Sequence, residues 1–179
     1  MKNKKTITFY IFSTLFSISL GTLLHFTYQW SNNNIFVASF SSVNESTWEH
    51  LKLIFFPLLI TTLIGYFYIG KNYSNFLSSQ TIGIIISILF IIIFFYTYTG
   101  IFGINLGFIN ILSFIIAILL GNFISYKLLG SFFTLNKKTI FTILIILFFS
   151  FIILTYVSPK INLFKDPISN NYGIPVKYS

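Results

Sequence analysis

Five stretches of this 179-residue chain are each long and apolar enough to cross a lipid bilayer as a helix. A spanning helix needs about 20 consecutive apolar residues. Backbone groups in lipid must hydrogen-bond within their own segment, so helices are expected and open sheet is not. The sequence therefore predicts an all-α fold, a bundle of five transmembrane helices that forms one integral membrane domain over residues 1–179. The expected spans cover about residues 7–30, 48–70, 81–102, 109–129 and 139–157, and residues 158–179 form an outer tail.

Charged residues make up only 8% of the chain, against about 25% in a typical soluble domain. The net charge of +8 comes entirely from lysine. These lysines stand at the ends of the spans, where membrane topology and anionic lipid explain them better than nucleic acid does. Membrane lipid is therefore an expected partner and nucleic acid is not. The chain has no cysteine, which excludes disulfides, thiolate nucleophiles and cysteine metal ligands.

The lysines also predict the orientation of the chain in the membrane. The connections after the first and third expected spans carry no lysine, whereas the other side collects Lys2, Lys4, Lys5, Lys71, Lys127, Lys137 and Lys138. The positive-inside rule then places the N-terminus in the cytoplasm, and an odd number of spans places the C-terminus outside. Lys160, Lys165 and Lys177 in the tail argue against this orientation. The first stretch is too long for a signal peptide and lacks a typical cleavage site, so we expect it to be retained.

The polar block Asn44 to Lys52 reads N-E-S-T-W-E-H-L-K and stands directly before the second apolar stretch. We expect the block to be helical and continuous with that span, with Ser42 or Asn44 as the N-cap and Glu45 in a capping box with Ser42. On such a helix Glu45, Glu49 and Lys52 share a face, Glu49 and Lys52 pair at i, i+3, and His50 points about 100° away from Glu49.

Two interpretations of this block remain open. Glu45 either caps the helix and complements its dipole, or it belongs to a polar site, because ionisable groups within membrane segments are costly and usually functional. His25 lies in the last turns of the first span, at the same predicted depth, so we expect it to meet the block in one outer pocket. An interfacial aromatic belt is the alternative explanation for His25 and for Trp48. The expected polar cluster comprises His25, Asn44, Glu45, Trp48, Glu49, His50 and Lys52.

Glutamate and histidine are both metal ligands and acid–base groups. The block's E-x-x-x-E-H spacing differs from the metalloprotease H-E-x-x-H pattern, so a metal site must recruit His25 or Asp166 from elsewhere. The candidate ligands are His25, Glu45, Glu49 and His50. No motif identifies a cofactor, a catalytic residue or a nucleotide-binding loop.

Two further features concern the helices themselves. Pro57 lies inside the second expected span, where it removes a helix hydrogen bond and favours a kink. Gly103 and Gly107 form a G-x-x-x-G pair, but they straddle an expected turn, which weakens their interpretation as a helix-packing motif.

Six segments of the chain form a recognisable set. They are His25-Phe26-x-Tyr28-x-Trp30-Ser31, Val43-Asn44-Glu45-Ser46-x-Trp48-Glu49-His50-Leu51-Lys52-Leu53, Phe56-Pro57, Tyr96 to Ile101, Ser125 to Leu129, and Asp166-Pro167 before Tyr172-Gly173. Together they resemble a family of small membrane proteins from low-GC Gram-positive bacteria, a family described as a domain of unknown function. The resemblance covers nearly the whole chain and is most specific in the polar block. It implies a multi-span bacterial plasma-membrane protein and implies no activity.

Three functions fit these observations. The first is transport of a small solute or ion, or an accessory role in it; an inverted repeat would favour this function, and the five spans show none. The second is a membrane-embedded enzyme that acts on a lipid or a lipid-linked headgroup. The third is a non-catalytic partner or sensor. Convergence of His25 with the polar block would favour the first two functions over the third.

Overall fold

The computed structural model describes residues 3–175, and Lys2 and Lys177 lie outside this range. Five long helices account for most of it: α1 (Lys4–Trp30), α3 (Thr47–Tyr68), α4 (Phe76–Phe102), α5 (Gly107–Leu128) and α6 (Lys137–Tyr156). A short helix, α2 (Ile35–Ala38), and two 3₁₀ turns, η1 (Gly70–Asn72) and η2 (Asn162–Phe164), complete the fold. The described residues form no strand beyond one isolated bridge between Lys165 and Tyr172. The predicted all-α fold is confirmed, and all five long helices are apolar enough to cross a membrane.

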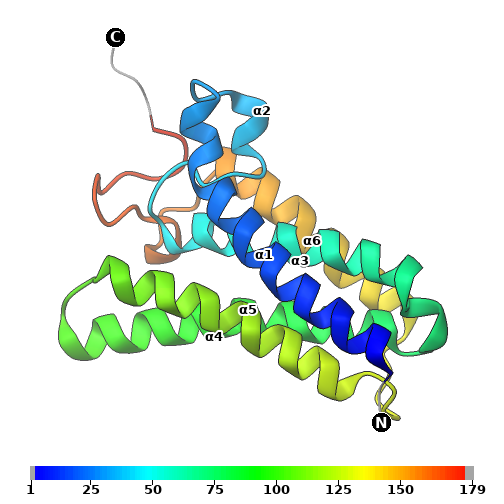
Figure 1. The fold of residues 1–179 in the computed structure, drawn as a ribbon. Helices are drawn as coiled ribbons and strands as arrows, with labels where there is room; N and C mark the ends of the chain where they lie inside the picture. The colour runs from blue at the N-terminus through cyan, green and yellow to red at the C-terminus, as the bar shows by residue number, and fades with distance from the viewer. Residues whose placement is uncertain (1–2, 176–179) are drawn as a thin grey trace.

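Helix α3 occupies the centre of the bundle. In its most apolar window 61% of the residues are buried, against 17% in α6 at the periphery. Helix α1 packs along α3, α4 and α5 form a hairpin beneath them, and α6 packs on α3 and α4 (Figure 1). Phe55, Ile84, Ile118 and Phe151 fill the core between these helices. Large apolar side chains also cover the outside of the helices, a surface that suits lipid and not water.

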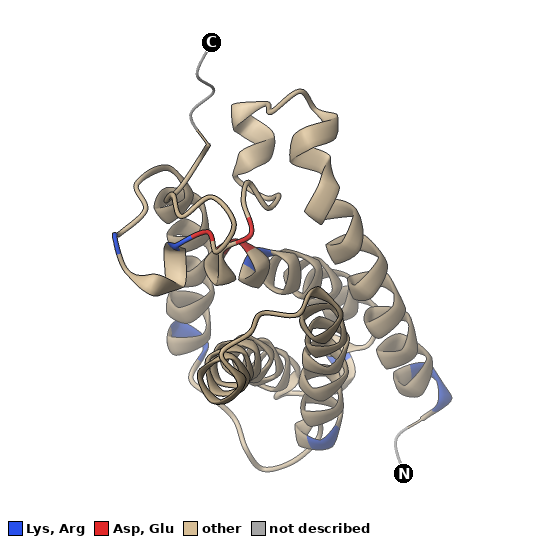
Figure 2. Ribbon diagram, turned by 90° about the vertical axis from the view of Figure 1, so that its left-hand side faces the viewer, with Lys and Arg blue, Asp and Glu red and all other residues tan. Residues whose placement is uncertain are grey.

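The two ends of the bundle differ in charge (Figure 2). One end, called here the lysine end, carries Lys4, Lys5, Lys71, Lys127, Lys137 and Lys138, and no described acidic residue. The opposite end, the acidic end, carries Glu45, Glu49 and Asp166, which are balanced by Lys52, Lys160 and Lys165. The lysine end therefore has the excess positive charge that the positive-inside rule associates with the cytoplasm.

Small residues set the close approach of α4 and α5. A Cβ atom added to Gly83 would lie 2.6 Å from the carbonyl oxygen of Gly121, and the reverse addition meets the carbonyl of Gly83 at the same distance. Gly103 instead ends α4 at a φ of 66°, and neither it nor Gly107 has a neighbour within 4 Å of an added Cβ. The G-x-x-x-G pair therefore belongs to a turn, and the packing glycines lie deeper in the hairpin.

Candidate functional site

The polar block begins as a loop and becomes a helix only at Thr47, so the predicted helical start at Asn44 is wrong. Ser46 is the N-cap, and its side chain accepts from the Glu49 N–H at 3.4 Å. Asn44 accepts from the Ser46 N–H at 2.8 Å, a local turn that competes with helix. Ser42 donates to the Asn44 carbonyl at 2.6 Å and caps no helix. The N-cap Ser46 thus lies four residues after Ser42 and two after Asn44, the two expected caps. Glu45 therefore precedes the helix and does not share a helical face with Glu49 and Lys52.

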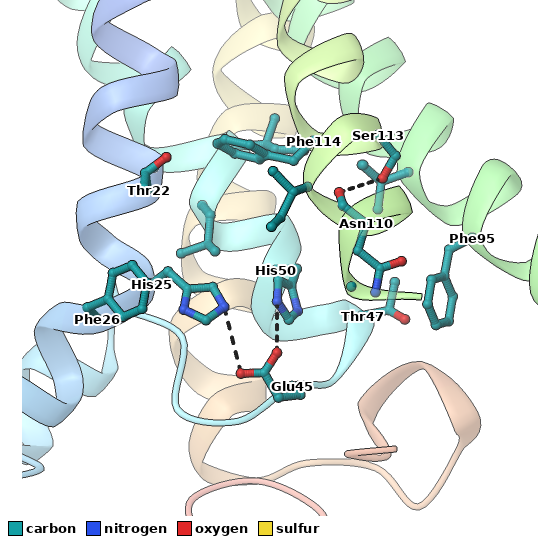
Figure 3. A pocket seen from close by; sticks show the side chains of 16 residues that line it. Thr22, His25, Phe26, Glu45, Thr47, His50, Phe95, Asn110, Ser113 and Phe114 are labelled. Carbon is teal, nitrogen blue, oxygen red and sulfur yellow. Dashed lines mark hydrogen bonds and ion pairs between the residues drawn. The ribbon is translucent and has the colours of Figure 1, made fainter. Parts of the chain in front are cut away.

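The loop position of Glu45 brings its carboxylate between two histidines from different helices. Glu45 Oε1 lies 3.7 Å from Nε2 of His25 at the end of α1, and Glu45 Oε2 lies 3.4 Å from Nε2 of His50 in the first turn of α3. The two imidazole rings have their centroids 5.3 Å apart. All three side chains are partly exposed, at 30–40% of their surface. The structure therefore unites His25, Glu45 and His50 in one group, called here the His–Glu–His cluster (Figure 3).

The helix start fixes the orientation of the His50 ring. Its Nδ1 lies 2.9 Å from the carbonyl oxygen of Ser46, one helical turn earlier. A carbonyl oxygen only accepts, so Nδ1 carries a hydrogen, and Nε2 is the ring nitrogen that faces Glu45. In the neutral ring Nε2 bears the lone pair that can bind a metal, and in the imidazolium form it carries a second proton that pairs with the Glu45 carboxylate. Nδ1 of His25 has no hydrogen-bond partner among the described residues. His50 is consequently the better-oriented of the two imidazoles.

The imidazoles also act on the charge of Glu45. Interaction with His25, and then with His50, holds the pKa of the Glu45 carboxyl well below its usual range, although partial burial opposes this effect. Glu45 is therefore a carboxylate at any physiological pH. An anionic oxygen thus lies between two nitrogen groups, an arrangement suited to binding a cation or to transferring a proton.

A pocket of about 310 Å³ opens beside the cluster between α1, α3, α4 and α5. Its ionisable groups lie toward the acidic end, where Thr47 and Asn110 join the His–Glu–His cluster, whereas Phe114 lies farther into the bundle (Figure 3). Thr22 and Ser113 lie at the depth of Phe114, and their hydroxyls donate to carbonyl oxygens of their own helices. The rest of the lining is mostly apolar and includes Phe26, Leu53, Ile54, Ile91, Phe95 and Ile111. The cavity is therefore polar at one end and hydrocarbon-like along its walls, and its volume lies within the usual range of ligand sites, about 300–1,000 Å³.

Glu49 and Lys52 form a separate, buried group on another face of α3. Lys52 Nζ lies 2.6 Å from Glu49 Oε2, which confirms the predicted i, i+3 pair. Lys52 also donates to the Ala38 carbonyl and to Thr155 of α6, while Glu49 accepts from the Val43 N–H and from the Thr155 hydroxyl. With their side chains 2% and 0% exposed, Glu49 and Lys52 join α3 to α6 and to the loop after α2. Glu49 therefore does not enter the pocket that was predicted to contain it.

The other predicted residues serve the acidic end in different ways. Asn44 donates to the Gly173 carbonyl at 2.8 Å and so holds the tail against the loop. Trp48 packs between Phe151 and Phe164, with ring centroids 4.7 and 4.6 Å away. Asp166 accepts from Ile168 N–H and the Ser169 hydroxyl in its own turn, and it does not join the cluster.

Sequence reasoning missed the apolar walls of the pocket. Ile111 and Phe114 gave no signal, because an apolar residue in a membrane helix has the same pattern whether it faces lipid, core or a cavity. Asn110 offered a weak signal, since an amide in the first turn of a membrane helix needs a partner. It finds two of them, Tyr98 at 2.6 Å and Asn105 at 2.8 Å.

Comparisons with known proteins place the chain in a family without assigning it an activity. No curated protein matches the chain, and no solved structure matches it. The model of a family of unknown function, DUF6512, matches residues 1–174. This match covers nearly the full length, including the polar block and most of the tail, so the chain belongs to the DUF6512 family.

Proposed function

We propose that this protein is a bacterial plasma-membrane protein that holds a lipid or a lipid-linked molecule in its pocket and acts on the polar headgroup. The observation that carries the proposal is the amphipathic construction of the cavity. The His–Glu–His cluster stands at one end, and Phe26, Leu53, Ile111 and Phe114 are among its apolar walls. A ligand with a charged head and a hydrocarbon tail matches both parts at once, whereas a small hydrophilic solute matches only the first.

The cluster supplies the chemistry that such a headgroup needs. Glu45 is ionised, and each imidazole is held within 4 Å of it. Imidazole and carboxylate groups are the usual donors and acceptors of protons in hydrolysis and group transfer. Their partial exposure at the end of the bundle gives the headgroup access to water. The geometry therefore supports an enzyme that works at the membrane surface better than a non-catalytic partner.

The lysine distribution supports the orientation. The lysine end collects six described lysines without an acidic residue, so we place it in the cytoplasm. The His–Glu–His cluster and the tail then face outward. In that orientation the headgroup of an outer-leaflet lipid lies at the depth of the cluster.

Transport is the second candidate, and one observation favours it. Thr6, Ser13 and Ser17 are fully buried hydroxyls on α1, the helix that also carries His25. Ser13 donates to Thr61 at 3.0 Å and to Asn122 at 2.9 Å. Hydroxyl groups that bond between helices in this way are explained by helix packing alone and do not require a transport path. The lipid-headgroup function is therefore preferred.

Lipid retention tests the proposal. The full chain would be purified in a mild detergent, and the lipids that co-purify would be quantified by mass spectrometry. Ile111→Trp adds bulk to the pocket wall, whereas Ile145→Trp adds the same bulk to α6 outside the pocket. The two isoleucines are similarly exposed, at 64% and 53%, so the variants differ mainly in whether the residue lines the pocket. We expect the first variant to lose most of a specific retained lipid and the second to keep it. Equal lipid content in both variants and the parent would contradict the proposal.

A further inference from the structure

We infer that His25, Glu45 and His50 bind one divalent transition-metal ion, with Zn²⁺ the best match, and that its fourth coordination position faces the pocket. The inference rests on the proposed function for the pocket's occupant, while the metal site itself is argued from geometry. One donor atom from each of the three residues lies within 4.8 Å of the other two. The site is assembled from α1, α3 and the loop between α2 and α3 (Figure 3).

The separations suit shared coordination better than direct hydrogen bonding. Nε2 of His25 lies 3.7 Å from Glu45 Oε1, and Nε2 of His50 lies 3.4 Å from Glu45 Oε2, whereas an N⁺–H···O⁻ hydrogen bond is about 2.7–2.9 Å long. With Zn–N distances of about 2.0–2.1 Å, neighbouring ligands in a tetrahedral site are roughly 3.3 Å apart. One donor atom from each residue already lies within 4.8 Å of the other two, so small rotations of the rings and of the carboxylate would bring the three donors around a single ion.

The donor set matches a catalytic rather than a structural zinc site. Two histidines and one glutamate with a fourth position left open is a known arrangement of zinc hydrolases, whereas structural sites close all four positions with protein ligands. The Nδ1–H of His50 is already held by the Ser46 carbonyl at 2.9 Å. Such an outer contact fixes the tautomer that leaves Nε2 free to bind a metal. His50 is thus the pre-oriented ligand, and the loop carboxylate of Glu45 completes the site.

The open position determines what the ion would contact. The cluster lines the same 310 Å³ cavity as Asn110 and Thr47, so a ligand in the pocket would direct an oxygen of its headgroup toward the ion. A phosphate or hydroxyl oxygen is the chemical class expected there. A bound Zn²⁺ would polarise that oxygen or activate a water molecule next to it.

Metal titration of the full chain in detergent tests the inference. After chelator treatment and dialysis, Zn²⁺ alone would be titrated by calorimetry, with bound metal counted by mass spectrometry. We expect one ion per chain in the parent protein, and an affinity at least about tenfold weaker in Glu45→Gln and in His50→Gln. Asp166→Asn removes a carboxylate at the same end of the bundle, outside the cluster, and is expected to bind Zn²⁺ as the parent does. His25→Gln, on another helix, provides a further ligand variant if one of the first two fails to elute as a folded monodisperse species.

The outcomes separate this inference from the proposed function. No Zn²⁺ binding by the parent chain, or unchanged binding by the folded ligand variants, would overturn the metal site even if a lipid is retained in the pocket. One-to-one Zn²⁺ binding that depends on the three ligands supports the site even if Ile111→Trp leaves lipid content unchanged. In that second case the lipid proposal fails and the metal site stands.

Discussion

Removal of one partner from the buried Glu49–Lys52 pair is expected to destabilise the protein strongly. Lys52→Met leaves a carboxylate that is almost fully buried, with only the Val43 N–H and the Thr155 hydroxyl as partners. Glu49→Gln leaves the Lys52 ammonium fully buried against the Ala38 carbonyl and Thr155. An uncompensated buried charge of this kind costs about 3–5 kcal/mol. The double variant Glu49→Gln/Lys52→Met removes both charges. Its loss in free energy of unfolding is therefore expected to be smaller than the sum of the two single losses by roughly 2 kcal/mol.

The free energy of unfolding would be measured by sodium dodecyl sulfate titration in mild-detergent micelles, with tryptophan fluorescence as the signal. Trp48 is a suitable reporter because it packs on Phe151 and Phe164 beside the pair. Glu45→Gln is the matched control: it makes the same chemical change on a carboxylate that is 40% exposed, and its expected cost is below about 1 kcal/mol. The structural role of this pair would be refuted if each single variant lost no more free energy of unfolding than the Glu45→Gln control. It would also be refuted if the loss in the double variant equalled the sum of the two single losses.

Two further predictions follow from the arrangement of the helices. The chain has no native cysteine, so Ile168→Cys in the exposed tail is expected to react with an impermeant maleimide in intact cells, and Phe132→Cys at the lysine end only after lysis; the reverse pattern would invert the topology. Gly121→Ala is expected to lower the free energy of unfolding by about 1–3 kcal/mol, because its new methyl group meets Ser87 and the Gly83 carbonyl, whereas Gly100→Ala has open space around it and is expected to be nearly neutral in the same titration.

The helical membrane fold could be predicted because its determinant is local. A run of about 20 apolar residues needs no knowledge of its neighbours to be identified as a span. The positions of the helix ends depend more on contacts with the rest of the fold. Helix α4 begins at Phe76, earlier than the expected residue 81, because Ser78, Ser79 and Gln80 are buried and bonded within the bundle and do not lie in a polar connection.

The site was only partly predictable, because its position depends on where α3 begins. Two consecutive Ser-x-x-Glu patterns compete in the sequence, one from Ser42 and the other from Ser46. The turn closed by Asn44 decides in favour of the second. The choice moves Glu45 out of the helix and toward His25, a contact between residues that no helical periodicity relates. The pocket walls carried no comparable pattern, since their residues are those of any membrane helix.

The position at which α3 begins explains how one short block contributes both to the buried Glu49–Lys52 pair and to the His–Glu–His cluster. Glu49 and His50 are adjacent in the chain, yet successive helical residues diverge by about 100°. Glu49 therefore turns toward Lys52 and Thr155, where every partner is buried and satisfied. His50 turns toward Glu45 and the pocket, where the cluster is partly open and its nitrogen and oxygen atoms still have capacity to bind. The buried Glu49–Lys52 pair fixes the loop on one face of α3, and this allows the neighbouring face to hold His25, Glu45 and His50 in place for a ligand. A helix that began four residues earlier would have placed Glu45 on the same face as Glu49. His25 would then have lacked its carboxylate partner.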